Sequence, residues 1–250
     1  MAGGKGINVA QIAIYRAGEC LACTQGREET NLLFTQAFQP GDELVFTTDT
    51  PYARVKVDAS VEGANLYLPE HTFRFTPPLT GDGLAPYPPG AFLGERHLLS
   101  LAPYKPGERR NLALNPLDAR GADGGAYPHV WANVETRDES VFCARNAIDG
   151  ITAAAGHGIW PFQSWGIGAR EDAFLTLDFG RDVIADELIL YLRADFPHDA
   201  YWTQASVKLS NGLEHTFPLE RRDGPQRVPM AEQTIRWLTL YRLIKNEDPS

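Results

Sequence analysis

The sequence predicts an all-β protein, a jelly-roll β-sandwich preceded by a smaller β domain. Short runs rich in β-branched and aromatic residues recur along the chain, separated by Gly, Pro, Asp and Asn, which is typical of strands joined by turns. No convincing amphipathic helix longer than about ten residues interrupts these runs. With 250 residues and 43% hydrophobic content, the chain is long enough for two units that each bury a core.

The first domain is expected to cover residues 1–100. Its strands are predicted from apolar runs bounded by turn residues, as in the Gln-Pro-Gly-Asp turn that precedes Glu43. The expected strands are residues 7–15, 31–34, 43–47, 53–57, 64–68 and 72–76. Residues 77–109 are rich in proline, which cannot donate a hydrogen bond to a sheet, so we interpret them as an ordered connector on the surface.

The second domain is expected to cover residues 110–250, with a glycine-rich loop at 121–125 near its start. Its runs and connections have lengths that are typical of a sandwich. Asn211-Gly212 is a hairpin signal between two of the runs. The expected strands are residues 141–144, 174–179, 187–193, 205–209, 214–219, 226–228 and 234–240.

The charge of the chain disfavours two classes of partner. The formal charge of -9 and the isoelectric point near 5.2 disfavour nucleic acid and anionic membranes, both of which attract basic surfaces. No apolar run reaches the roughly 18 residues of a membrane span, and the first residues lack the apolar core of a secretory signal. Cys20, Cys23 and Cys143 are odd in number, as expected of free thiols. We therefore expect a cytoplasmic protein with no nucleic-acid or membrane partner.

Aromatic and polar residues gather in three turn-like stretches between Tyr127 and Trp202. The stretches read A-Y-P-H-V-W, G-H-G-I-W-P-F-Q-S-W-G and R-A-D-F-P-H-D-A-Y-W, and the interval holds four of the five tryptophans. A sugar ring has an apolar face that stacks on aromatic rings and a rim of hydroxyls that need fixed polar partners. This mixture of side chains predicts a carbohydrate ligand.

The second half resembles the discoidin, or coagulation-factor C-type, branch of the galactose-binding-like β-sandwiches, which includes carbohydrate-binding modules. The matching motifs are A-R-N-A-I-D-G at 144–150, Q-S-W-G at 163–166, L-T-L-D-F-G at 175–180, E-L-I-L-Y-L-R at 187–193, V-K-L-S-N-G at 207–212, Gln226 and the strand 235–240. The resemblance implies a jelly roll whose ligands bind loops at one end of the sheets. The whole chain also resembles uncharacterised bacterial two-domain proteins.

The same resemblance implies a structural calcium ion near the Ile-Asp-Gly turn. Its ligands here would include Asp149, with Thr152 as a further oxygen donor. Members of the family usually end with another strand, and residues 7–15 are one candidate to fill that position in the sheet.

The predicted ligand site lies where the three stretches converge. Arg193 and Asp195 are either an ion pair that pins a loop or the charged rim of a pocket. Trp165 either packs in the core or contacts the ligand, whereas Trp237 is expected in the core. The predicted ligand-binding residues are His129, His157, Trp160, Gln163, Trp165, Arg193, Asp195, His198, Tyr201 and Trp202.

The functional prediction is non-catalytic sugar recognition, and two alternatives stay open. A carbohydrate-active enzyme could use the His- and Asp-rich stretches to hold a metal, or a pair of carboxylates. A protein-interaction module is the second alternative. The sequence contains no H-E-x-x-H, G-x-S-x-G, P-loop or strand-linked G-x-G-x-x-G motif that would identify a reaction.

Overall fold

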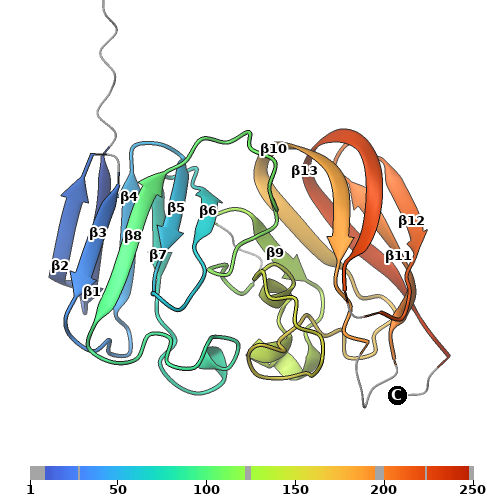
Figure 1. Cartoon of the computed structure of the whole chain (residues 1–250), viewed down its shortest axis with the longest axis horizontal. Coiled ribbons are helices and arrows are strands. Elements are labelled where there is room, and N and C mark those ends of the chain that lie inside the picture. Colours follow the sequence, from blue (N-terminus) through green and yellow to red (C-terminus); the bar gives the residue numbers. More distant parts are fainter. Residues whose placement is uncertain (1–8, 28, 122–124, 195–199, 223, 248–250) are drawn as a thin grey trace, which may run out of the picture.

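The architecture is that of an all-β sandwich protein, as predicted. A computed structural model describes residues 9–27, 29–121, 125–194, 200–222 and 224–247, and arranges their strands in three antiparallel sheets that form two units side by side (Figure 1). The helices in these ranges are short 3-10 turns: η1 (Asp82–Leu84), η2 (Thr136–Asp138), η3 (Ser140–Phe142) and η4 (Ala144–Ala147). None of them has the length and hydropathy that a membrane crossing requires.

The first unit packs two four-stranded sheets face to face, with strand orders β2-β1-β4-β7 and β3-β8-β5-β6. Alternation positions its side chains: in β3, Thr30, Leu32 and Phe34 are buried while the residues between them are exposed. Large residues such as Phe46, Leu99 and Leu101 fill the space between the sheets. The strands are β1 (Ala10–Arg16), β2 (Glu19–Gly26), β3 (Thr30–Phe34), β4 (Glu43–Thr48), β5 (Tyr52–Lys56), β6 (Ala64–Tyr67), β7 (Thr72–Phe75) and β8 (His97–Pro103).

Two strands of this unit were not predicted. β2 has few apolar residues, because it is an edge strand with Cys20 and Cys23 exposed, and its turn uses Ala17-Gly18 with positive φ at both positions. The connector interpretation of residues 77–109 was wrong for 97–103, which form β8 between β3 and β5. Neighbouring prolines obscured the alternation of buried residues in β8. Strand β1 lies between β2 and β4, so it does not complete the second unit.

The second unit is built on a five-stranded sheet with the order β12-β11-β13-β10-β9. Its strands are β9 (His129–Ala132), β10 (Leu175–Leu190), β11 (Trp202–Leu209), β12 (Glu214–Pro218) and β13 (Gln226–Lys245). The long strands β10 and β13 arch over (Figure 1), and the register between them shifts between Asp178 and Val183. Both halves of the arch share one core, in which Leu177 and Leu240 from one half join Val183 and Val228 from the other.

Residues 141–144 do not form the predicted strand. Val141 and Phe142 belong to η3 and Ala144 begins η4. Val141 and Phe142 are both buried, which consecutive residues of a half-exposed strand cannot be. The amide of Asn146 holds these turns together by donating hydrogen bonds to the carbonyl oxygens of Ser140 and Ser164, at 2.8 and 3.3 Å.

The two units are joined by hydrogen bonds as well as by chain connectivity. Tyr67 in β6 and Tyr127 exchange backbone hydrogen bonds of 2.8 and 3.0 Å. The guanidinium of Arg145 lies 4.5 Å from the centroid of the buried Tyr87 ring and donates a hydrogen bond to the Tyr87 hydroxyl. The backbone N–H of Ser140 donates to the Asp82 carboxylate at 2.8 Å. These contacts fix the position of the loops of the second unit against the first.

Candidate functional site

The loop stretches predicted to converge do so in part. The rings of Trp165 and Trp202 meet edge to face with their centroids 6.0 Å apart, and the indole N–H of Trp165 donates to the carbonyl oxygen of Val134 at 2.9 Å. The guanidinium of Arg193 reaches the hydroxyl of Ser164 at 3.4 Å. Both tryptophans also pack against the hydrophobic core, which is the structural role that the sequence left open for Trp165.

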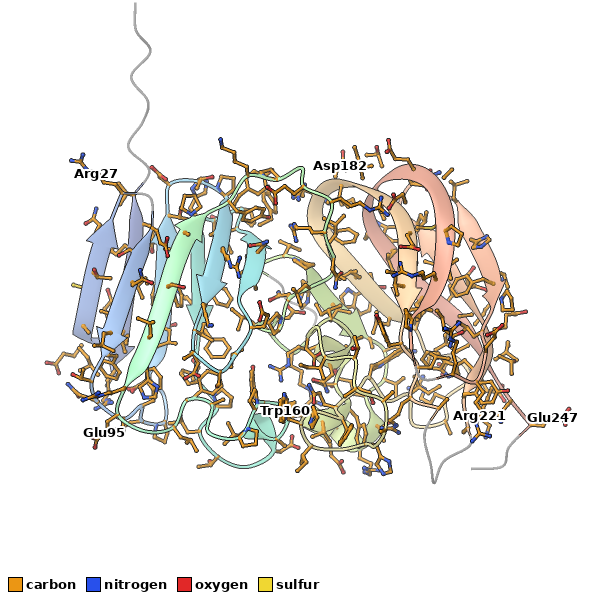
Figure 2. The ribbon with its side chains drawn as sticks, viewed as in Figure 1. Arg27, Glu95, Trp160, Asp182, Arg221 and Glu247 are labelled. Atoms are coloured by element: carbon orange, nitrogen blue, oxygen red, sulfur yellow. The ribbon has the colours of Figure 1, made fainter. Side chains whose placement is uncertain are left out.

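Other predicted residues have separate surroundings. Trp160 is half-buried at the junction of the units (Figure 2), where its backbone N–H donates to the backbone carbonyl oxygen of Ala85 at 2.9 Å. His157 is exposed, and Tyr201 is half-buried and exchanges hydrogen bonds with Asn246. Asp195 and His198 lie outside the described residues, so the charged rim with Asp195 stays a prediction.

His129 lies in β9 and is buried, 2% exposed. Its Nδ1 is 2.8 Å from a carboxylate oxygen of Asp118, whose other oxygen accepts the N–H of Val130. Burial acts to lower the pKa of His129, but the hydrogen bond and charge of Asp118 outweigh it and raise the pKa. The His129 ring therefore forms a buried pair with Asp118 and does not lie in an open loop.

Asp149, the predicted calcium ligand, is buried beside Gln163 at the Ile-Asp-Gly turn. Its carboxylate accepts hydrogen bonds from the N–H of Ile151 at 2.7 Å and from the amide of Gln163 at 2.6 Å, and burial raises its pKa to about 6. Thr152 is exposed. The described residues contain no group of three or more His, Cys, Asp and Glu side chains that could hold a metal. Calcium at this turn stays a prediction.

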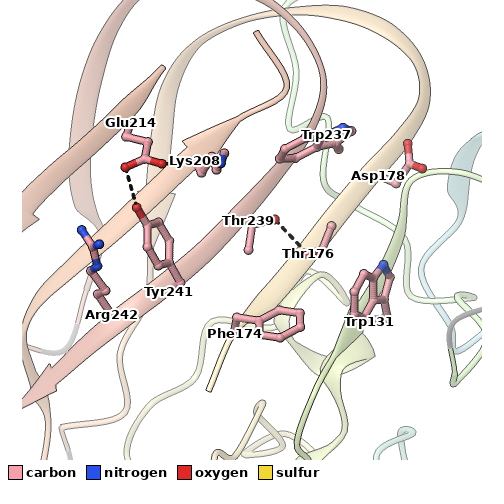
Figure 3. Close-up of a pocket in the computed structure, with 10 residues that line it drawn as sticks. All are labelled: Trp131, Phe174, Thr176, Asp178, Lys208, Glu214, Trp237, Thr239, Tyr241 and Arg242. Carbon is pink, nitrogen blue, oxygen red and sulfur yellow. Dashed lines mark hydrogen bonds and ion pairs between the residues drawn. The ribbon is translucent and has the colours of Figure 1, made fainter. Parts of the chain in front are cut away.

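A concave surface that the sequence did not predict lies elsewhere, on the outer face of the five-stranded sheet (Figure 3). We call it the sheet-face groove; its volume is about 660 Å³. Its lining combines aromatic rings, hydroxyls and charges from all five strands. The lining residues are Trp131, Phe174, Thr176, Asp178, Lys208, Glu214, Trp237, Thr239, Tyr241 and Arg242.

Sheet register brings these residues together. Thr176 in β10 is paired with Trp131 in β9 and with Thr239 in β13, and the two threonine hydroxyls are 2.9 Å apart. The rings of Trp131 and Phe174 meet edge to face, with their centroids 5.4 Å apart. The hydrogen-bonded hydroxyls thus form the floor of the groove, between the aromatic side chains (Figure 3).

Charged groups occupy the β12 side of the groove. Lys208 pairs with Glu214 at 3.6 Å, and the hydroxyl of Tyr241 donates to Glu214 at 2.9 Å. Desolvation, followed by the hydrogen bond and charge of Glu214, raises the pKa of Tyr241. On the other side, Asp178 accepts the N–H of Gly180 at 2.7 Å.

The groove was not predicted from the sequence, and the expectation of a core position for Trp237 was wrong. Trp237 is half-buried and lines the groove, while Leu238 and Leu240 point into the core. A signal was present: F-L-T-L-D at 174–178 and W-L-T-L-Y at 237–241 share one alternation of leucine with aromatic and polar residues. With period two, the leucines fill one face and the other residues form the opposite one.

Compared with models of known protein families, the chain matches none. It also matches no curated protein sequence.

Proposed function

We propose that the second unit binds carbohydrate without catalysis, in the sheet-face groove. The observation that carries the proposal is the lining itself, with four aromatic side chains around a floor of two hydroxyls on the open face of a sheet. Outward-facing positions of a sheet are ordinarily polar, so a cluster of large aromatic rings there has a cost that a ligand can offset.

The chemistry of the groove matches a sugar chain. Indole and phenol rings stack on the C–H faces of sugar rings, and the threonine hydroxyls and charged groups can satisfy the hydroxyl rim. Trp237 and Tyr241 are four residues apart on one strand, which separates their α-carbons by roughly 13 Å. That span exceeds one sugar ring, so we expect an oligosaccharide rather than a monosaccharide.

A glycan array followed by isothermal titration tests the proposal. Trp237→Ala should lower the affinity for the best array ligand about tenfold or more, because it removes a stacking platform. Trp160→Ala, in the loop stretch 156–166, is the matched control and should leave affinity unchanged. Circular dichroism monitors folding in both variants.

Each other outcome has a clear meaning. Loss of affinity in Trp160→Ala alone would move the sugar site to the loops. Absence of binding to any glycan would contradict carbohydrate recognition and favour the protein-interaction alternative, while release of a shortened product would favour the enzyme.

A further inference from the structure

We infer that the sheet-face groove selects a sugar that carries a carboxylate, with Arg242 as the residue that binds this group. The inference rests on the proposed function and adds the chemical class of the ligand. It starts from the backbone of β13, where two consecutive residues face the groove.

Tyr241 and Arg242 both line the groove, although neighbouring residues of a regular strand point to opposite faces. The reason is a bulge. Ser206 in β11 is paired with Tyr241 and Gln204 with Ile244, so β13 holds an extra residue between these pairs. Arg242 lies in this bulge, and its backbone adopts the left-handed conformation, with φ 49°.

A left-handed conformation is uncommon for residues other than glycine and costs about 1 kcal/mol or more. Bulges often reorient a side chain next to a functional site. Here the bulge turns the guanidinium of Arg242 to the face that carries Trp237 and Tyr241, whereas Leu243, the next residue, is buried in the core.

The guanidinium of Arg242 retains its hydrogen-bonding capacity. It lies over the ring of Tyr241, 5.2 Å from the centroid, and forms no hydrogen bond or ion pair with any residue that the structure describes. Lys208, the other cation of the groove, is already paired with Glu214. The guanidinium N–H groups of Arg242 can therefore donate hydrogen bonds to a ligand.

A guanidinium presents N–H groups in a planar fork that matches a carboxylate in bidentate fashion. The Tyr241 ring covers one face of this fork and leaves its edge for a ligand. Because the chain carries a net charge of -9, the overall field repels an anionic sugar, and attraction must come from a local group. The position of Arg242 beside a stacking ring fits the carboxylate of a uronic acid within a glycan.

The test compares uronic-acid oligosaccharides with their methyl esters, which share the backbone but lack the charge. In titrations of the full chain, we expect at least one acid to bind about tenfold more tightly than its ester, as a bidentate charged contact would give. Arg242→Gln should lower the affinity for the acid to that for the ester and leave the ester unchanged. Arg236→Gln, an exposed arginine of the same strand outside the groove lining, is the control and should bind as the wild type does.

The outcomes separate this inference from the proposed function. Equal binding of acid and ester, with no effect of Arg242→Gln, would overturn the carboxylate assignment and leave carbohydrate binding in place. Preference for a sulfated glycan over every uronic acid would also overturn it. Absence of binding to acids, esters and neutral glycans alike would overturn both.

Discussion

The ring of Tyr127 packs so closely against Gly180 that a β-carbon added to this glycine would lie 2.5 Å from two of its ring atoms. Gly180 adopts φ +67° at the point where the register between β10 and β13 is interrupted. The bend of these two strands and the junction between the two units therefore meet at this contact. The position therefore requires glycine for both its conformation and its space.

Gly180→Ala should destabilise the second unit by more than the cost of placing an alanine at positive φ. Gly212 provides the control, since it also has positive φ but no atom within 4 Å of an added β-carbon. We expect Gly212→Ala to cost about 1–2 kcal/mol and Gly180→Ala about 1–3 kcal/mol more, because of overpacking. Urea unfolding measures both, and equal costs would contradict the close contact.

The hydroxyl floor of the groove can be tested without changing its shape. Thr239→Val removes the hydroxyl that pairs with Thr176 and keeps the branched side chain, so folding should be retained. Affinity for the glycan should fall about five- to thirtyfold, as expected for a lost hydrogen bond of about 1–2 kcal/mol. Thr234→Val, at an exposed position of the same strand, should leave affinity unchanged. An unaltered affinity in Thr239→Val would place the ligand away from the floor.

The raised pKa of Asp149 predicts that the protein becomes less stable as pH rises. Its folded-state pKa of about 6 lies above the ordinary value of 3.8 because the carboxyl is buried. Its stabilising contribution is therefore complete below about pH 4 and is lost as pH rises through 6, by about 3 kcal/mol in total.

Asp149→Asn should reduce this slope, because the amide stays neutral and Gln163 can reorient its own amide to pair with it. Thermal unfolding between pH 4 and 7.5 provides the measurement. Asp172→Asn is the control: this exposed carboxylate has its pKa lowered by Arg170, so its removal should leave the slope above pH 4 unchanged. A slope in Asp149→Asn as steep as that of the wild type would contradict the assignment.

The contact between Arg145 and Tyr87 should stabilise the joint. Tyr87→Phe keeps the ring under the guanidinium but removes the hydroxyl that accepts its hydrogen bond. We expect a loss of about 1–3 kcal/mol in the free energy of unfolding, because a charged donor loses a partner in a largely buried place. Tyr191→Phe, at an exposed tyrosine, is the control. Identical melting temperatures for the wild type and Tyr87→Phe would show that the hydroxyl does not contribute.

How much the sequence revealed depended on the range of the interactions involved. Strands such as β3 and β5 were predicted because their own alternation and flanking turns define them locally. β8 was missed because its partners, β3 and β5, lie far away in the chain while prolines lie close by.

The groove illustrates the same limit for function. Trp131, Phe174 and Trp237 come from three separate segments, and only the pairing of β9, β10 and β13 brings them to one face. The sequence shows that aromatic and polar residues are abundant between Tyr127 and Trp202. Because these residues are densest in the three turn-like stretches, the site was predicted in the loops. Alternation around Thr176 and Thr239 was the local sign of a second, open face.

The backbone bridge between Tyr67 and Tyr127 has a consequence for solubility. Strand β6 ends the sheet β3-β8-β5-β6, and β9, which begins two residues after Tyr127, ends the other sheet. Unpaired strand edges attract the edges of other molecules and promote aggregation. The bridge occupies backbone hydrogen-bonding groups of β6 at Tyr67, and a change that separates the two units would expose them. We therefore expect association of the two units to hinder pairing of the β6 edge with other molecules, independently of what either unit binds.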